Sequence, residues 1–239
     1  MRLSLIAALV PCVAAAYELK TDHTGADVRL TGPLHFTVDP QLETLLGAPG
    51  AIDAVKASAA TWSLAGVDVT AETGDISGGG NVITAITHDW PYDDGVMAVT
   101  LLTLDATDHT IMRANVFINA AQNRFGVLAA DSQRGGGFAD VQNTVTHELG
   151  HALGLAHVMD HPEAVMYPMA FDGDVNKRTL SHDDLAGLDA LYPQGLTAGA
   201  GPQLGCAVSG GPSWLAGMLA LVAVARARHA RAARRLARV

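Results

Sequence analysis

The chain carries histidines and a glutamate at a spacing that suits metal binding. His147 and His151 are four residues apart, so on a helix their imidazoles lie on the same face, one turn from each other. Glu148 directly follows the first histidine, which places its carboxylate beside a shared metal ion and not on it. A carboxylate in that place can act as a general base toward water.

A third histidine follows after a glycine. If the helix simply continued, His157 would turn away from the face that carries the first two histidines. Gly154 tolerates a left-handed backbone conformation, so the chain can leave the helix there and bring His157 back to the metal. Three neutral imidazoles leave one position of a tetrahedral zinc ion open, which distinguishes catalytic from structural zinc. The sequence therefore predicts one catalytic zinc ion held by His147, His151 and His157.

The segment from His147 to His157 resembles the zinc-binding motif of the metzincin peptidases, and residues 165–168 resemble the Met-turn that follows it. The likeness is greatest to the matrixins and their bacterial relatives, and it covers roughly residues 17–193. It implies a zinc metalloendopeptidase in which Glu148 activates zinc-bound water. It also implies that Met166 forms an apolar floor beneath the zinc. Further similar segments lie at 95–100, 114–119, 140–143, 180–184 and 190–193.

The resemblance implies an α+β fold of the metzincin, or zincin-like, type. A twisted, mostly parallel sheet would cover the active-site helix, with a second helix behind. A small C-terminal subdomain, with the Met-turn and a C-terminal helix, would follow His157. The strand at 96–101 would border the cleft and pair with an extended substrate. The loop at 168–177 would shape the pocket for the residue after the cut.

Periodicity of apolar residues predicts the individual elements. The expected strands lie at 28–30, 34–38, 67–71, 81–86, 95–104 and 111–118. The expected helices lie at 51–64 and 141–153, and a third follows Ser181 through Leu191. Asp140 and Ser181 are suitable N-caps for the second and third helices.

Charge is distributed unevenly along the chain. All 24 carboxylates lie between residues 17 and 205, together with eight of the fifteen lysines and arginines, so this part is strongly acidic. Such a field repels phosphate backbones, which excludes nucleic acid as a partner. A length of 239 residues suits one well-packed domain plus processing segments. We expect a monomer whose partner is a protein or peptide substrate.

Residues 1–16 are predicted to be a secretory signal peptide. Arg2 provides a basic start, an apolar run follows, and three alanines precede Tyr17 as a cleavage site. The protein is therefore expected to be exported to the extracellular space or the cell surface. Residues 17–194 would form the catalytic domain. After cleavage Cys206 is the single cysteine, so no intramolecular disulfide is expected.

Two further segments follow the predicted domain. Residues 195–213 form a Gly/Pro-rich linker that contains Cys206, and residues 214–239 combine a short hydrophobic helix with an arginine-rich end. Spanning a bilayer takes about 20 apolar residues, more than this helix offers, so docking on the domain and a membrane stop are both open. The order of features resembles the C-terminal sorting tags of myxobacterial surface proteins. It implies anchoring or processing at Cys206 and a transient membrane association through the tail.

Two alternatives concern further metals and the absence of catalysis. Animal matrixins also bind structural zinc and calcium, and seven loop residues could supply ligands: His88, Asp89, Asp93, Asp94, Asp105, Asp108 and His109. Their spacing does not match the structural-zinc pattern. Solvated loops, with a turn at 105–109, are the preferred interpretation, and Ca²⁺ is left unassigned. The rival function is a catalytically silent surface binding protein on a metzincin scaffold, against which the intact Glu148 argues.

Overall fold

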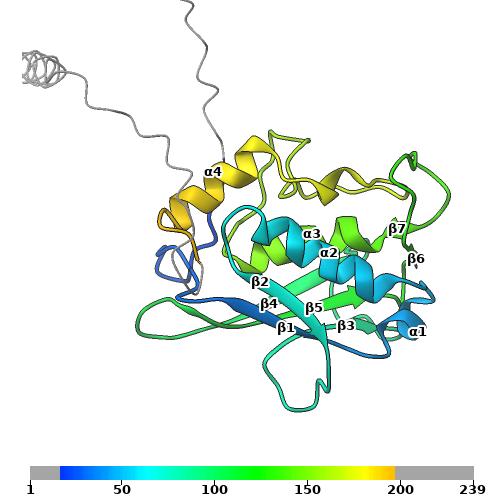
Figure 1. Cartoon of the computed structure of the whole chain (residues 1–239), viewed down its shortest axis with the longest axis horizontal. Coiled ribbons are helices and arrows are strands. Elements are labelled where there is room, and N and C mark those ends of the chain that lie inside the picture. Colours follow the sequence, from blue (N-terminus) through cyan, green and yellow to red (C-terminus); the bar gives the residue numbers. More distant parts are fainter. Residues whose placement is uncertain (1–16, 197–239) are drawn as a thin grey trace, which may run out of the picture. The chain divides into compact units, whose positions relative to one another are not determined.

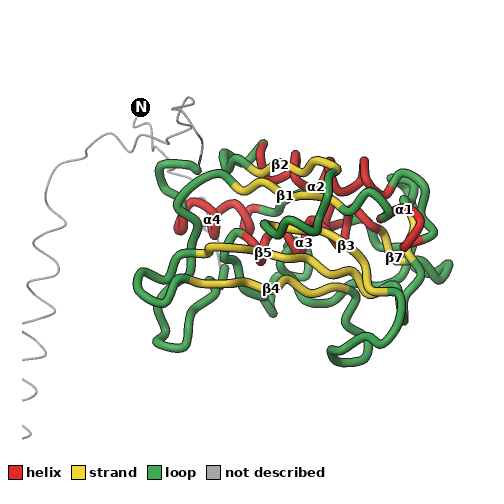
Figure 2. The backbone as a smooth tube through the Cα atoms, turned by 90° about the horizontal axis from the view of Figure 1, so that it is seen from below, coloured by secondary structure: helices red, strands yellow, loops and turns green. Residues whose placement is uncertain are grey.

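The computed structural model describes residues 17–196. The predicted signal peptide, most of the linker with Cys206, and the arginine-rich tail lie outside the described residues. Within them, the helices α2 (Ala51–Ser63) and α3 (Val141–Ala152) lie side by side over one face of a sheet (Figures 1 and 2). No helix in residues 17–196 is both long and apolar enough to cross a membrane.

The sheet has five strands in the order β2-β1-β3-β5-β4. They are β1 (Leu34–Val38), β2 (Val69–Thr73), β3 (Asn81–Ile86), β4 (Ala98–Leu104) and β5 (Ile111–Asn119). All neighbouring strands pair in parallel except β4, which runs antiparallel to β5 at one edge. The expected mostly parallel sheet is confirmed. The edge position of β4 matters for the site, because this strand runs beside the helix that carries the histidines.

Two of the helices begin at a residue whose side chain caps the helix N-terminus. They are α1 (Leu42–Leu46), α2 (Ala51–Ser63), α3 (Val141–Ala152), the short 3-10 helix η1 (Asn176–Arg178) and α4 (His182–Leu191). Asp140 caps α3 by accepting the amide of Asn143 at 2.8 Å. Ser181 and Asp184 form a reciprocal capping box at α4. Both predicted N-caps are therefore confirmed.

One predicted strand, at 28–30, does not form. The amide of Val28 donates to the carbonyl of Lys20, and the amide of Leu30 donates to the hydroxyl of Tyr192. Partners from loops thus take up the backbone groups that a strand would give to a neighbour, and Arg29 keeps a single bridge to Thr110. Four short elements were not anticipated: α1, η1 and the paired strands β6 (Phe125–Gly126) and β7 (Ala139–Asp140).

The core joins the two long helices through Trp62. This side chain is fully buried, and its indole Nε1 donates to the carbonyl of Thr146 at 2.9 Å, which connects α2 with α3. Gly150 of α3 lies under the same indole. A Cβ at this position would lie 2.9 Å from Trp62 and 2.3 Å from the sulfur of Met166. The missing side chain lets α2 and the turn at Met166 both pack directly against α3.

Candidate metal centre

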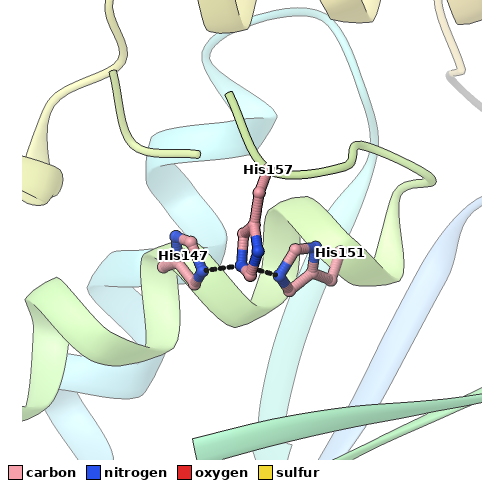
Figure 3. Close-up of side chains that lie close together, drawn as sticks. All are labelled: His147, His151 and His157. Carbon is pink, nitrogen blue, oxygen red and sulfur yellow. Dashed lines mark hydrogen bonds between the residues drawn. The ribbon is translucent and has the colours of Figure 1, made fainter. Parts of the chain in front are cut away.

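Three histidines meet at the side of α3. His147 and His151 project from adjacent turns of the helix, and His157 reaches between them from the loop that follows (Figure 3). The Nε2 atom of His157 lies 3.2 Å from Nε2 of His147 and 3.0 Å from Nε2 of His151. The structure thus brings together all three histidines predicted from the sequence, and they could hold a metal ion.

The opposite ring nitrogens determine how two of these imidazoles are oriented. Nδ1 of His147 lies 2.6 Å from the carbonyl oxygen of Val165, and Nδ1 of His151 lies 2.8 Å from that of Leu155. A carbonyl accepts a hydrogen bond, so each Nδ1 carries the hydrogen and each Nε2 offers its lone pair. Converging lone pairs repel one another unless a cation lies between them.

Zinc fits this donor set. Zinc–nitrogen bonds of about 2.0–2.1 Å in a tetrahedron separate the nitrogens by about 3.3 Å, close to the distances found here. Burial lowers the pKa of His151 to about 3 and that of His147 well below its ordinary value, with nearby lysines adding to the effect. Both imidazoles are therefore neutral at pH 7, the form that binds a metal.

The chain leaves α3 as the glycine predicts. Gly154 has φ of 97°, and a Cβ there would lie 2.5 Å from the carbonyl oxygen of Val28. The loop beyond it is held by the start of the domain: the amide of Lys20 donates to the carbonyl of Gly154, and the amide of Ala156 donates to that of Glu18, both at 2.8 Å. His157 is thus positioned by a segment distant in sequence.

The carboxylate of Glu148 is almost fully buried and has a hydroxyl partner from the edge strand. Thr100 of β4 has its Oγ1 2.6 Å from Oε2 of Glu148 and 2.9 Å from the carbonyl oxygen of the same residue. Burial raises the pKa of Glu148 to about 7, and the Thr100 hydroxyl and Lys20 oppose that rise. A carboxyl group with a pKa near neutrality can both accept and return a proton.

Met166 lies against the underside of α3, in a turn fixed by α4. The carboxylate of Asp184 accepts the amides of Val165 at 2.9 Å and Met166 at 3.1 Å, and it also accepts the amide of Ser181. The amide of Val158, next to His157, donates to the carbonyl of Met166. Asp184 therefore fixes the turn at Val165 and Met166, and this turn places the Val165 carbonyl beside His147.

Lys177 is the unexpected neighbour of the site. Its side chain is buried, its Nζ lies 3.3 Å from Nδ1 of His147, and it donates to the carbonyl of Tyr167. Its amide donates to the side chain of Asn143, one turn before His147.

The sequence placed Thr100 in the strand expected to border the cleft and Lys177 in the loop expected to shape a pocket. It did not predict the contacts of these two residues, or of Asp184, with the site. Ser181 and Asp184, three residues apart, are a local signal that could have pointed to Asp184. The contacts of Thr100 and Lys177 join residues far apart in the sequence.

The loop residues considered for a further metal lie apart from this centre. Asp105 and Asp108 accept amides within the 105–110 turn, and Asp94 accepts from the side chain of Gln122. Nδ1 of His109 contacts the carboxylate of Asp22. Within residues 17–196, the three histidines are the sole group of three or more potential ligands close enough to share a metal ion.

A helix that carries two of three clustered histidines, a glycine turn leading to the third and a methionine turn packed beneath them define the metzincin class. The family model for matrixin, peptidase family M10, matches residues 14–193, and the chain belongs to this family. Matrixins use zinc, which agrees with the chemistry of the donor set.

Individual relatives match over shorter stretches. The chain is 53% identical to human matrilysin over 47 residues, which cover 20% of this chain and 17% of matrilysin. It is 35% identical to metalloendoproteinase 5-MMP of Arabidopsis thaliana over 92 residues, which cover 36% of this chain and 25% of that protein. Interstitial collagenase of Bos taurus is 45% identical over 67 residues, which cover 27% of this chain and 13% of the collagenase. The matched segments thus span a quarter or less of each relative.

Proposed function

We propose that this chain is a zinc-dependent metalloendopeptidase with His147, His151 and His157 as metal ligands and Glu148 as general base. The observation that carries the proposal is the convergence of three Nε2 atoms beside a buried carboxylate that a hydroxyl holds in place. Membership of the matrixin family supports the same activity.

The residues divide the proposed reaction between them. When bound, zinc supplies a Lewis acid that makes water a nucleophile near neutral pH. Thr100 holds Oε2 of Glu148, which leaves Oε1 to take the proton from the attacking water and to deliver it to the departing amine. The carbonyls of Val165 and Leu155 keep two imidazoles in the tautomer that binds metal.

A catalytically silent scaffold is the alternative. Such a protein needs the histidines for stability but has no use for a buried carboxylate whose pKa is raised, because burying a charge costs stability. Glu148 is buried and has a dedicated partner in Thr100. That arrangement favours the peptidase.

The test compares zinc content and cleavage of a quenched peptide library by the purified protein and by Glu148→Gln. The variant should keep its zinc and lose about 10²–10⁴-fold in turnover. The matched control is Glu72→Gln, whose side chain is 80% exposed and should leave both measurements unchanged. Chelator should abolish cleavage by the wild type. Zinc-loaded protein that cleaves nothing would favour the silent scaffold instead.

We also propose that the protein is exported, and that its domain is a monomer that acts on protein or peptide substrates. The support for export is the sequence of residues 1–16, and for transient membrane association it is the order of features around and beyond Cys206. Mass spectrometry of the secreted protein would identify the first residue after processing. An N-terminus at residue 1 would contradict the signal peptide.

A further inference from the structure

The segment between the second and third histidines positions both of them. The carbonyl of Leu155 accepts a hydrogen bond from Nδ1 of His151 at 2.8 Å, and His157 follows in the same segment. A shift of this segment therefore moves one imidazole through its hydrogen bond and the other through its backbone. Whatever holds residues 153–156 in place also holds two of the three proposed metal ligands in place.

The carbonyl of Leu153 lies just past the end of the helix. α3 ends at Ala152, and the last carbonyls of a helix have no amide partner one turn further on. The hydroxyl of Tyr192 donates to the Leu153 carbonyl, with 2.6 Å between the two oxygens. A side chain from the far end of the domain thus bonds to the backbone where the chain turns toward His157.

Tyr192 is itself held from several sides. It is 7% exposed, and its hydroxyl also accepts the amide of Leu30 at 3.0 Å. Its own amide donates to the carbonyl of Leu188 in α4 at 2.7 Å. The side chain of Leu191, next to it, lies 3.3 Å from the place that a Cβ on Gly154 would take. One hydroxyl therefore joins the start of the domain, the end of α3 and the end of α4.

Loss of this hydroxyl would leave two backbone groups without their partner. Leu153 is fully buried and Leu30 is 8% exposed, so water replaces the hydroxyl poorly. The Leu153 carbonyl could find another partner only if the segment moved, and a metal centre tolerates displacements of about 0.5 Å. Groups that hold metal ligands from behind change metal affinity by about 10–100-fold when they are removed.

We propose that Tyr192 is a positioning residue of the metal centre, whose hydroxyl fixes the exit of the chain from α3 and thereby the placement of His151 and His157. This inference rests on the proposed metal ligands. It gives the last part of the domain a direct role in metal retention, through a contact between residues 39 positions apart.

The test replaces Tyr192 by phenylalanine, which removes the hydroxyl and keeps the ring. The zinc-loaded Tyr192→Phe protein should lose its metal to a chelator about tenfold faster than the wild type. After exchange of zinc for Co²⁺, its visible absorption should differ from that of the wild type, because the intensity of this absorption depends on the angles between the ligands. Neither measurement requires cleavage of a peptide.

Ser63→Ala is the matched control for a general loss of stability. The Ser63 hydroxyl also donates to a carbonyl, that of Val69 at 2.6 Å, and accepts an amide, that of the same residue at 3.1 Å. These contacts join the end of α2 to β2 and involve none of the histidines. The control should lower the melting temperature as Tyr192→Phe does, but keep the wild-type rate of zinc release and the wild-type Co²⁺ spectrum.

A second measurement needs no variant. If Tyr192 couples the exit of α3 to Leu30, binding of zinc should in return slow hydrogen exchange of the Leu30 amide, and do so more than for the Val69 amide. Equal slowing of the two amides, together with zinc release from Tyr192→Phe no faster than from Ser63→Ala, would overturn the inference and leave the proposed function intact. Wild type that holds neither zinc nor Co²⁺ would overturn the proposed ligands and this inference with them.

Discussion

The support beneath the histidines and the surroundings of Lys177 beside them are built in opposite ways. Beneath, Gly150, Met166 and Asp184 form a closed arrangement in which the carboxylate of Asp184 receives three backbone amides. Beside, Lys177 is buried with one backbone carbonyl as its acceptor. The support satisfies its polar groups internally, whereas the Lys177 ammonium, with three hydrogens to donate, has one carbonyl acceptor. Changes in the support should therefore lower stability, and changes among the reacting groups should alter catalysis at little cost in stability.

The largest effect on stability is expected for Asp184→Ala. The change leaves the amides of Val165 and Met166 buried without their acceptor and also removes the capping box of α4. Stranded buried amides cost about 1–3 kcal/mol each, so we expect a loss of about 3 kcal/mol in unfolding free energy. Urea unfolding beside Asp189→Ala, an exposed aspartate of the same helix, measures it. A loss no larger than that of the control would contradict the role of Asp184.

Gly150→Ala should come next, although alanine is the better helix former. Its Cβ would lie 2.3 Å from the Met166 sulfur and 2.9 Å from Trp62, both tightly packed. We expect a net loss of about 2 kcal/mol from overpacking. In a double-mutant cycle, Met166→Ala should make room for the new methyl group. The double mutant should therefore lose less stability than the two single mutants lose together. Additive losses would show that the contact with Met166 is unimportant.

Glu148→Gln should stabilise the metal-free protein at high pH. The pKa of this carboxyl is raised to about 7 in the folded protein and stays near 4.5 in the unfolded chain. Above pH 7 the folded state must carry a buried charge, which destabilises it. Below pH 7 that carboxyl takes up a proton and the penalty declines. The variant should exceed wild type by on the order of 2 kcal/mol at pH 8 and by much less at pH 5. Urea unfolding at both pH values measures it, and an equal gain at the two would refute the explanation.

The smallest of these effects is expected for Thr100→Val, which removes the hydroxyl that holds Glu148 and keeps the shape of the side chain. We expect kcat to fall about tenfold, or about 1.4 kcal/mol, with KM, zinc content and melting temperature nearly unchanged. Thr100→Ser should restore most of the rate, because it restores the donor. Thr103→Val, exposed on the same strand, is the control. If zinc content fell together with kcat, Thr100 would act by stabilising the metal centre and not by holding Glu148.

The parts of the site that could be predicted from the sequence depend on residues close together in the chain. The spacing of His147 and His151 follows helical periodicity, and Gly154 forecasts the sharp exit that returns His157. Thr100 and Lys177 could not be anticipated in the same way, since their partners lie 48 and 30 residues away. Their approach depends on how β4 and the loop before α4 pack against α3.

The same distinction explains the fold. The strand at 81–86 and the capped helices follow from their own residues, because alternation, helical periodicity and N-caps are local signals. The segment at 28–30 has the apolar residues of a strand, but Lys20 and the Tyr192 hydroxyl take its amides. Helix α1 is five residues long, which is too short for periodicity to be evident.

The loop of His157 has a consequence for the biosynthesis of the protein. It is bonded to Glu18 and Lys20 at the start of the domain, and the neighbouring turn is bonded to Asp184 near the domain's end. Ribosomes make these segments first and last. The histidines therefore reach this arrangement after the final helix has emerged, and a chain still under translation lacks the finished centre. For a hydrolase made among the proteins of its own cell, that order delays activity until synthesis of the domain is complete.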